Sequence, residues 1–124
     1  MILIDTTLWI DHLAHPDERI RELLARRIVL IHPFVIGEIA VGRLRNRDSV
    51  LDGLHSLREA VVAEPDEVLS FIVRHQLEGT GIGYVDVHLL ASVRLTPGLK
   101  LWTRDKPLKS IAERLGVAAD IRAH

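Results

Sequence analysis

Short apolar runs of strand length alternate along this chain with longer amphipathic runs of helical length. This alternation is typical of βα units built around a parallel sheet. Several of the short runs are apolar at successive rather than alternate positions, as expected of strands covered on both faces. The sequence therefore predicts an α/β fold in which a mostly parallel sheet of about five strands is the middle of three layers. The candidate strands are Ile2–Asp5, Ile28–Ile31, Ala60–Ala63, Leu99–Thr103 and Val117–Ala119.

Helical patterning fills the intervals between these runs. Pro65 is a good helix start because proline loses no hydrogen bond at the first position, and the two acids that follow it face the positive end of the helix dipole. Gly116 indicates a helix end. The predicted helices are Thr7–Ala14, Asp17–Arg27, Phe34–Leu44, Asp48–Glu59, Pro65–Leu77, Val85–Leu95 and Pro107–Leu115.

Composition limits the classes of function. With 124 residues, 48% of them hydrophobic, we expect one domain over residues 1–124 with a core of its own. The 16 Lys and Arg nearly balance the 17 Asp and Glu, so an anionic partner must be held locally rather than by an overall basic field. The lack of cysteine excludes a disulfide framework, a thiol nucleophile and a thiolate zinc site. No apolar run approaches the roughly 20 residues that span a bilayer, and we expect a cytoplasmic protein.

Four acids lie in apolar surroundings that penalise an ionised carboxylate by several kcal/mol unless cations or hydrogen-bond donors compensate. One follows the run Met1–Ile4, one interrupts Phe34–Val41, one divides a run that begins at Tyr84, and one follows Leu99–Arg104. These acids are Asp5, Glu38, Asp86 and Asp105. Acids placed in this way need a physical reason.

The predicted topology brings the acids within reach of one another. Asp5 and Asp105 follow predicted strands, and parallel strands end at one edge of the sheet, beyond which ligands bind in open α/β folds. Glu38 and Asp86 fall early in predicted helices that can reach the same edge. Clustered carboxylates repel, and a divalent cation removes the repulsion. Hard oxygen ligands suit Mg²⁺ or Mn²⁺, and such a site attracts a phosphodiester.

At these acids the chain resembles the PIN-domain ribonucleases, in particular the VapC-type toxins of type II toxin–antitoxin pairs. The matching segments keep the family's order and spacing across nearly the whole length. They are Ile4–Ile10, Gly37–Gly42, Tyr84–Ala91 and Thr103–Lys106. The resemblance implies a PIN-like three-layer α/β/α sandwich and a Mg²⁺-dependent endoribonuclease, with Mn²⁺ as a substitute. In that activity metal-activated water hydrolyses RNA, which inhibits translation and growth until an antitoxin neutralises the toxin.

The resemblance also implies roles for particular residues. Asp5, Glu38, Asp86 and Asp105 would be the catalytic acids, with Asp5 and Asp86 as direct metal ligands and the other two assisting. Thr6 and Thr103 would hydrogen-bond a carboxylate or a metal-bound water. One departure is Pro107, which stands where the family often has a further acid, and this leaves the number of bound ions open.

The partners implied by the resemblance are an RNA substrate and a cognate VapB-type antitoxin. A homodimer and a larger toxin–antitoxin assembly are likewise implied. Operator DNA would be bound only through the antitoxin, and no membrane is involved.

Structural explanations compete for each acid. Asp5 and Asp105 are also suited to capping helices, and Asp86 to complementing a helix dipole. Glu38 is harder to explain in this way. Phe34, Val35 and Val41 share its helical face, which we expect to point inward, and the alternative for Glu38 is a buried ion pair with an arginine.

Basic, aromatic and histidine residues near the acids also admit two interpretations. Arg43, Arg45 and Arg47, and likewise Arg104 and Lys106, form either a solvated face or a phosphate grip for RNA. Trp9 and Trp102 are expected to be core anchors rather than base-stacking platforms. The seven histidines lack the spacing of a zinc site, and His88 lies nearest to the predicted acidic cluster.

Two other functions remain open for such a chain. A non-catalytic PIN-fold module that binds a protein partner would keep the fold without cleavage. A metal-dependent phosphatase would use the same acids on small phosphomonoesters.

Overall fold

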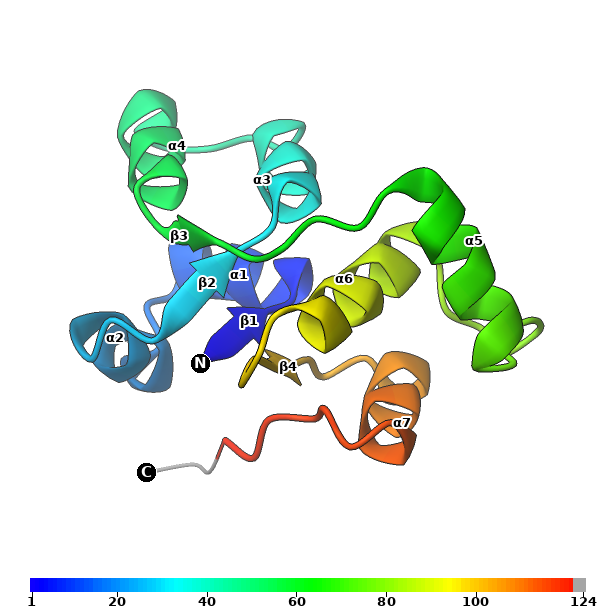
Figure 1. Ribbon diagram of the computed structural model, residues 1–124. Helices are drawn as coiled ribbons and strands as arrows, with labels where there is room; N and C mark the ends of the chain where they lie inside the picture. Colours follow the sequence, from blue (N-terminus) through cyan, green and yellow to red (C-terminus); the bar gives the residue numbers. More distant parts are fainter. Residues whose placement is uncertain (122–124) are drawn as a thin grey trace.

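The computed structural model describes residues 1–121 and contains a parallel sheet flanked by helices (Figure 1). The sheet has the strand order β3-β2-β1-β4, and every neighbouring pair is parallel. The strands are β1 (Ile2–Ile4), β2 (Val29–Ile31), β3 (Arg58–Glu59) and β4 (Lys100–Trp102). The helices are α1 (Thr6–Ala14), α2 (Glu18–Ala25), α3 (Pro33–Ala40), α4 (Arg47–His55), α5 (Pro65–Arg74), α6 (Tyr84–Leu95) and α7 (Lys106–Arg114).

The predicted α/β class and parallel sheet are confirmed, but the sheet has four strands rather than about five. The predicted strand Ala60–Ala63 is wrong, because the third strand is Arg58–Glu59. Both residues of this short edge strand are exposed, so no apolar run marks them. The predicted strand Val117–Ala119 is reduced to one isolated bridge, between Leu101 and Ala118.

The core surrounds the two central strands. Leu3, Ile4, Leu30 and Ile31 are buried, as expected of strands covered on both faces. Helix α6 is buried continuously from Val87 to Val93 and packs against β4 and α5. Its first turn leaves the core and carries Asp86. Within residues 1–121, no helix is both long and apolar enough to cross a membrane.

Helix α3 begins directly after β2 at a buried histidine. The Nδ1 of His32 accepts a hydrogen bond from the backbone N–H of Phe34 at 3.0 Å and caps the helix. Burial, together with the charge of nearby His88, lowers the pKa of His32 to about 4. The imidazole is therefore neutral near pH 7 and keeps the lone pair that the cap requires. This cap fixes the start of the helix that carries Glu38.

Candidate active site

Asp5 lies at the carboxyl edge of the sheet, where β1 passes into α1. The register pairs Ile4 with Trp102, so the residues that follow them, Asp5 and Thr103, lie side by side. The Thr103 hydroxyl donates a hydrogen bond to Asp5 Oδ2 at 2.7 Å, and the Thr6 backbone N–H donates to Oδ1 at 2.7 Å. Asp5 is only 7% exposed. It caps α1, as the structural explanation predicts, and it also faces the site.

Asp105 is joined to Asp5 through Thr103. Its backbone N–H donates to Thr103 Oγ1 at 3.1 Å, and its Oδ2 accepts from the Leu108 N–H at 3.0 Å, which caps α7. Pro107 occupies the first turn of α7, where its missing N–H costs no helical hydrogen bond. The position at which the family often has a further acid is thus part of a helix start.

Glu38 lies on α3 and contacts the other side of the site. Its Oε1 accepts a hydrogen bond from the Thr6 hydroxyl at 2.7 Å. The prediction that its helical face points inward is wrong for Glu38 and Phe34, which are exposed, and for Val41, which is 89% exposed. Of the residues assigned to that face, Val35 is buried as predicted. The buried side of α3 consists of Val35, Ile36 and Ile39.

The competing explanation for Glu38, a buried ion pair with an arginine, is also wrong. The three ion pairs found within residues 1–121 do not include Glu38.

Asp86 is the third residue of α6 and approaches the site from the opposite helix. Its Oδ2 accepts a long hydrogen bond, 3.4 Å, from the backbone N–H of Gly83, which closes the first turn. The carboxyl group is half-buried and has no hydroxyl donor comparable to Thr103 or Thr6 among its hydrogen bonds within the described chain. Its charge is therefore less well compensated than that of Asp5.

The four predicted acids line one pocket of about 400 Å³, together with Thr6, Thr7, Ile10 and Val41. Burial raises the pKa of Asp86 to about 6, and the negative charge of Asp5 adds to the shift. Burial also raises the pKa of Asp5, against the hydrogen bond from Thr103, while Glu38 and Asp105 add repulsion. The fold thus brings the acids close enough to repel one another. Their catalytic role stays a prediction.

The donor set of this pocket fits a hard divalent cation. All four acids offer carboxylate oxygens, and a cation would offset the burial and the mutual repulsion that raise the pKa of Asp5 and of Asp86. Within residues 1–121, no three His, Asp or Glu side chains are arranged closely enough to enclose a metal ion. Mg²⁺ does not require such a cage, because it keeps several waters and uses one or two protein carboxylates. Asp5 and Asp86 can supply these.

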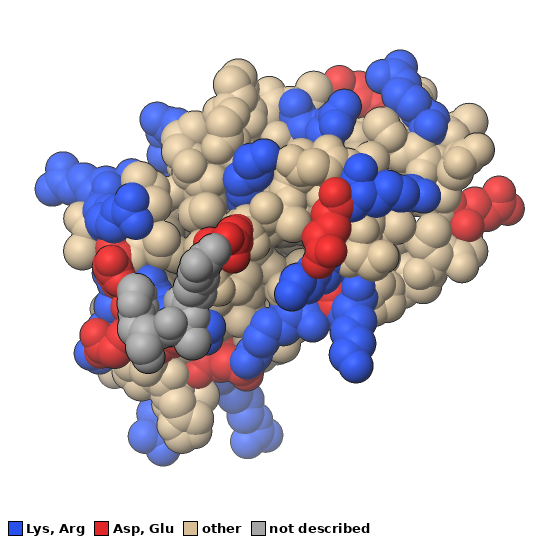
Figure 2. Space-filling model, turned by 90° about the horizontal axis from the view of Figure 1, so that it is seen from below, with Lys and Arg blue, Asp and Glu red and all other residues tan. Residues whose placement is uncertain are grey.

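The basic residues predicted near the site lie in different surroundings. Arg43 and Arg45 line a hollow that shares Ile10 with the acidic pocket. Arg104 forms an exposed ion pair with Asp11, and Lys106 is exposed in the first turn of α7. On the face shown in Figure 2, Lys and Arg side chains are interspersed with Asp and Glu, in keeping with the balanced net charge. An RNA-binding role for these residues stays a prediction.

The aromatic residues differ from expectation at one point. Trp9 and Trp102 are buried, as predicted for core anchors, and the Arg19 guanidinium lies 5.1 Å from the centre of the Trp102 ring. The sequence analysis did not identify the exposed rings of Phe34 and Tyr84, which lie on the helices that carry Glu38 and Asp86. The available signal was spacing, because Phe34 precedes Glu38 by four residues and therefore shares its exposed face.

With the fold and the pocket described, comparison with known proteins defines the family. Residues 2–114 match the PIN domain, and the chain belongs to the PIN-domain family. Within it the chain is of the VapC type. It is 48% identical over 118 residues to Ribonuclease VapC32 of Mycobacterium tuberculosis, in the strains CDC 1551 / Oshkosh and ATCC 25618 / H37Rv, and the match covers 95% of each chain.

A solved structure supports the fold independently. FitAcB from Neisseria gonorrhoeae has a TM-score of 0.64 to this chain at 22% sequence identity, with 95% of each chain covered. At this identity the likeness concerns the fold alone.

The raised pKa of Asp86 predicts that the metal-free protein is destabilised by this acid. Between pH about 4 and about 6, the folded protein binds more protons at this site than the unfolded chain, so the free energy of unfolding falls as the pH rises through this range and stays lower above it. In EDTA at pH 7.5, Asp86→Asn should raise the free energy of unfolding by about 1–2 kcal/mol, allowing for the partial exposure of the site. Urea denaturation at pH 5 and 7.5 measures the effect.

Asp66→Asn is the matched control, because Asp66 also lies in a helical first turn but outside the acidic pocket. Asp66 there benefits from the helix dipole, so its replacement should be neutral or slightly destabilising. If Asp86→Asn unfolds at the same urea concentration as the wild type, or at a lower one, the Asp86 carboxylate does not lower the free energy of unfolding, and the prediction is wrong.

Proposed function

We propose that this protein is a Mg²⁺-dependent endoribonuclease that acts as a VapC-type toxin, with Mn²⁺ as a substitute ion. The observation that carries the proposal is the meeting of Asp5, Glu38, Asp86 and Asp105 in one pocket at the carboxyl edge of the sheet. The relative named Ribonuclease VapC32, at 48% identity, supports the same activity. Cleavage of RNA would inhibit translation and growth.

Each side chain has a role in this proposal. Asp5 and Asp86 would hold the cation, while Glu38 and Asp105 would assist from the pocket wall. Thr103 fixes the orientation of Asp5 through the 2.7 Å hydrogen bond, and Thr6 fixes Glu38 in the same way. When bound, the cation would polarise the phosphodiester and activate water.

The wider setting of the proposal follows from the VapC type. The partner would be a VapB-type antitoxin that neutralises the toxin and alone contacts operator DNA. The chain would act in the cytoplasm as one PIN domain over residues 1–124, as a homodimer and within a larger assembly with the antitoxin. Arg43, Arg45, Arg104 and Lys106 would contribute contacts to RNA phosphates.

Cleavage of RNA by the purified chain, with and without divalent ions, tests the activity. Cleavage should occur in Mg²⁺ or Mn²⁺, should be lost in excess EDTA and should return when the ion is restored. We expect EDTA to lower the rate at least about a hundredfold, because the cation contributes several kcal/mol to transition-state stabilisation.

Two further assays separate this proposal from its alternatives. Full cleavage in EDTA would overturn the metal dependence. A chain that folds but cleaves no RNA in any divalent ion, or that hydrolyses only a chromogenic phosphomonoester, would overturn the endoribonuclease proposal.

A further inference from the structure

Aromatic side chains are few in this chain, and their exposure is uneven. There are two Trp, two Phe and one Tyr. Both Trp are buried, and Phe71 is half-buried against His75. Phe34 and Tyr84 are 38% and 49% exposed. The two aromatic rings that face solvent most openly are carried by α3 and α6, the helices that also carry Glu38 and Asp86.

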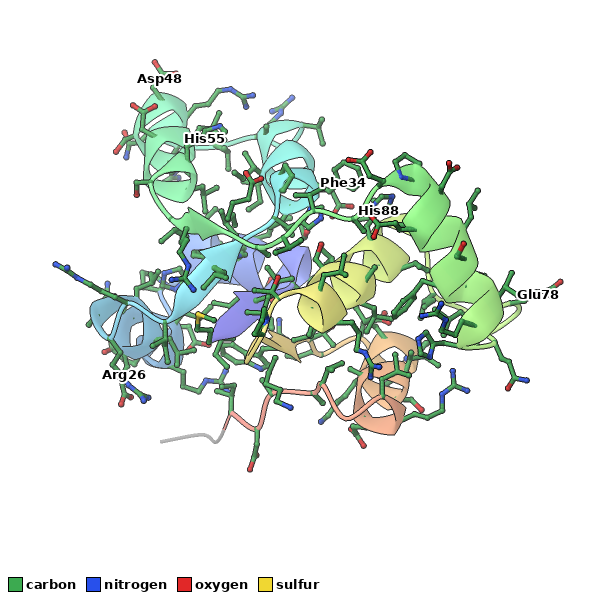
Figure 3. All side chains as sticks on the ribbon, viewed as in Figure 1. Arg26, Phe34, Asp48, His55, Glu78 and His88 are labelled. Atoms are coloured by element: carbon green, nitrogen blue, oxygen red, sulfur yellow. The ribbon has the colours of Figure 1, made fainter. Side chains whose placement is uncertain are left out.

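The two exposed rings meet at a buried imidazole. His88 is 2% exposed, and its ring centre lies 4.6 Å from that of Phe34 and 4.6 Å from that of Tyr84. The Tyr84 ring meets it edge-on at 90°, and the Phe34 ring is tilted by 59°. His32, also buried, contacts Phe34 at 5.1 Å between ring centres. Figure 3 shows Phe34 and His88 close together between α3 and α6.

This arrangement fixes the exposed rings before any ligand binds. Offset and edge-to-face contacts at these distances are favourable, and the imidazoles beneath are held in the core. A ring that is already ordered loses little side-chain entropy when a flat partner stacks on it. The pair therefore has the properties of a preformed stacking surface.

The stacking surface is carried by the same two helices as two acids of the pocket. Phe34 lies one helical turn before Glu38 on the exposed face of α3, and Tyr84 lies in the same first turn as Asp86. A strand whose phosphodiester occupies the pocket would pass its neighbouring bases across these rings. The bases of single-stranded RNA are free to stack, unlike those of a duplex.

The charge balance gives stacking a particular importance here. With a formal net charge of -1, the chain lacks the overall attraction that basic proteins exert on RNA. Stacking of a base on an aromatic side chain contributes about 1–3 kcal/mol and does not depend on the protein's charge. It can thus supply affinity for RNA in a site whose own walls are acidic.

We propose that Phe34 and Tyr84 form a nucleobase-stacking platform that holds single-stranded RNA beside the acidic pocket. This inference rests on the proposed nuclease function and names the part of the substrate, the flanking bases, that the protein recognises. It commits to RNA bases rather than to a second copy of the chain or a peptide, because Phe34 lies four residues before Glu38 and shares the exposed face of α3 with this pocket acid.

Binding of two oligonucleotides tests the platform. One is a single-stranded RNA of eight nucleotides, and the other has the same sugar-phosphate backbone without bases, both labelled and measured by fluorescence anisotropy in EDTA and in Ca²⁺. The variant Phe34→Ala with Tyr84→Ala should bind the RNA at least about tenfold more weakly and the abasic chain as the wild type does. Cleavage by the same variant in Mg²⁺ should show a raised KM.

Conservative variants separate aromatic stacking from apolar contact. Tyr84→Phe keeps a ring and should bind RNA like the wild type, whereas Phe34→Leu keeps apolar area without a ring and should bind more weakly. Val73→Ala, at an exposed residue of α5 away from the pocket, is the control for loss of exposed apolar surface. Thermal unfolding by circular dichroism verifies that each variant is folded.

A spectroscopic signal reports contact directly. Tyr84 is the chain's one tyrosine, so protein labelled with 3-fluorotyrosine has a single ¹⁹F resonance. The resonance should shift on addition of RNA and should not shift with the abasic oligonucleotide.

The outcomes distinguish this proposal from the proposed function. If the wild type cleaves RNA and the double variant binds and cleaves it equally well, the platform is wrong and the nuclease proposal stands. If the double variant changes only the molecular mass in solution, the rings belong to an interface between copies, which also overturns the platform. A wild type that neither binds nor cleaves RNA overturns both.

Discussion

RNA cleavage by an Asp5→Asn variant is expected to fall roughly a thousandfold, because the substitution removes a charge that the proposed cation would need and with it several kcal/mol of transition-state stabilisation. The variant should remain folded. Asparagine keeps an oxygen that accepts from the Thr6 N–H, and its amide N–H can donate to the Thr103 hydroxyl in place of the hydrogen bond that this hydroxyl donates to Asp5. The substitution also removes a buried charge, because burial raises the pKa of Asp5. Cleavage rates in Mg²⁺, with urea denaturation of the same sample, measure both effects.

Asp11→Asn provides the matched control on the same helix. Asp11 lies on α1, is exposed and pairs with Arg104, and exposed ion pairs contribute about 1 kcal/mol or less. This variant should cleave RNA at nearly the wild-type rate. An Asp5→Asn variant that cleaves as fast as Asp11→Asn would remove Asp5 from the proposed metal site.

The sequence was sufficient to predict the strand ends that position the site. β1 and β4 are marked by apolar runs because they are buried in the sheet, and each run ends just before a polar residue of the site. Asp5 and Thr103 are therefore neighbours by register, which follows from parallel pairing. The position of the edge strand was predicted wrongly because its residues are not buried. Arg58 and Glu59 are exposed, and hydrophobicity does not identify a strand whose side chains face solvent.

Which face of α3 is buried could not be read from its composition. The helix is apolar nearly all round, so periodicity gives no unique inward face. The structure buries Val35, Ile36 and Ile39 and leaves Phe34 and Val41 beside Glu38 in solvent. The sequence analysis predicted that the face containing Glu38 is buried, so it placed this acid in the core although its apolar neighbours Phe34 and Val41 are exposed. For the same reason it did not predict that the ring of Phe34 is exposed.

The same acid can both cap a helix and line the pocket, so the structural and the functional explanations of these acids do not exclude each other. Asp5 and Asp105 cap helices, and Asp86 closes a first turn, while all three line the pocket with Glu38. A cap uses one or two carboxylate lone pairs and leaves others free for a ligand. Helix starts at the carboxyl edge thus orient the acids and leave some of their carboxylate lone pairs free for a ligand. Sequence alone could not decide this, because capping and ligation require the same residue type.

Among substitutions that leave the charge of the site unchanged, we expect replacement of Thr103 to reduce RNA cleavage most. Its hydroxyl donates to Asp5 Oδ2 at 2.7 Å and accepts from the Asp105 N–H at 3.1 Å, so one oxygen aligns two acids. Thr103→Val keeps the shape and removes both hydrogen bonds. Loss of such a supporting contact to a metal ligand typically costs about 10- to 100-fold in activity or metal affinity.

Rescue by serine separates a positioning role from a packing role. Thr103→Ser keeps the hydroxyl and loses the methyl group, so it should retain most of the cleavage rate despite a small loss of stability in the buried site. Thr103→Val should lower kcat at saturating RNA while KM for RNA is nearly unchanged, because the RNA contacts remain. A valine variant that cleaves RNA as fast as the wild type would show that Thr103 only fills space. If serine fails as badly as valine, the hydroxyl alone does not position Asp5, and the rescue that a positioning role predicts is absent.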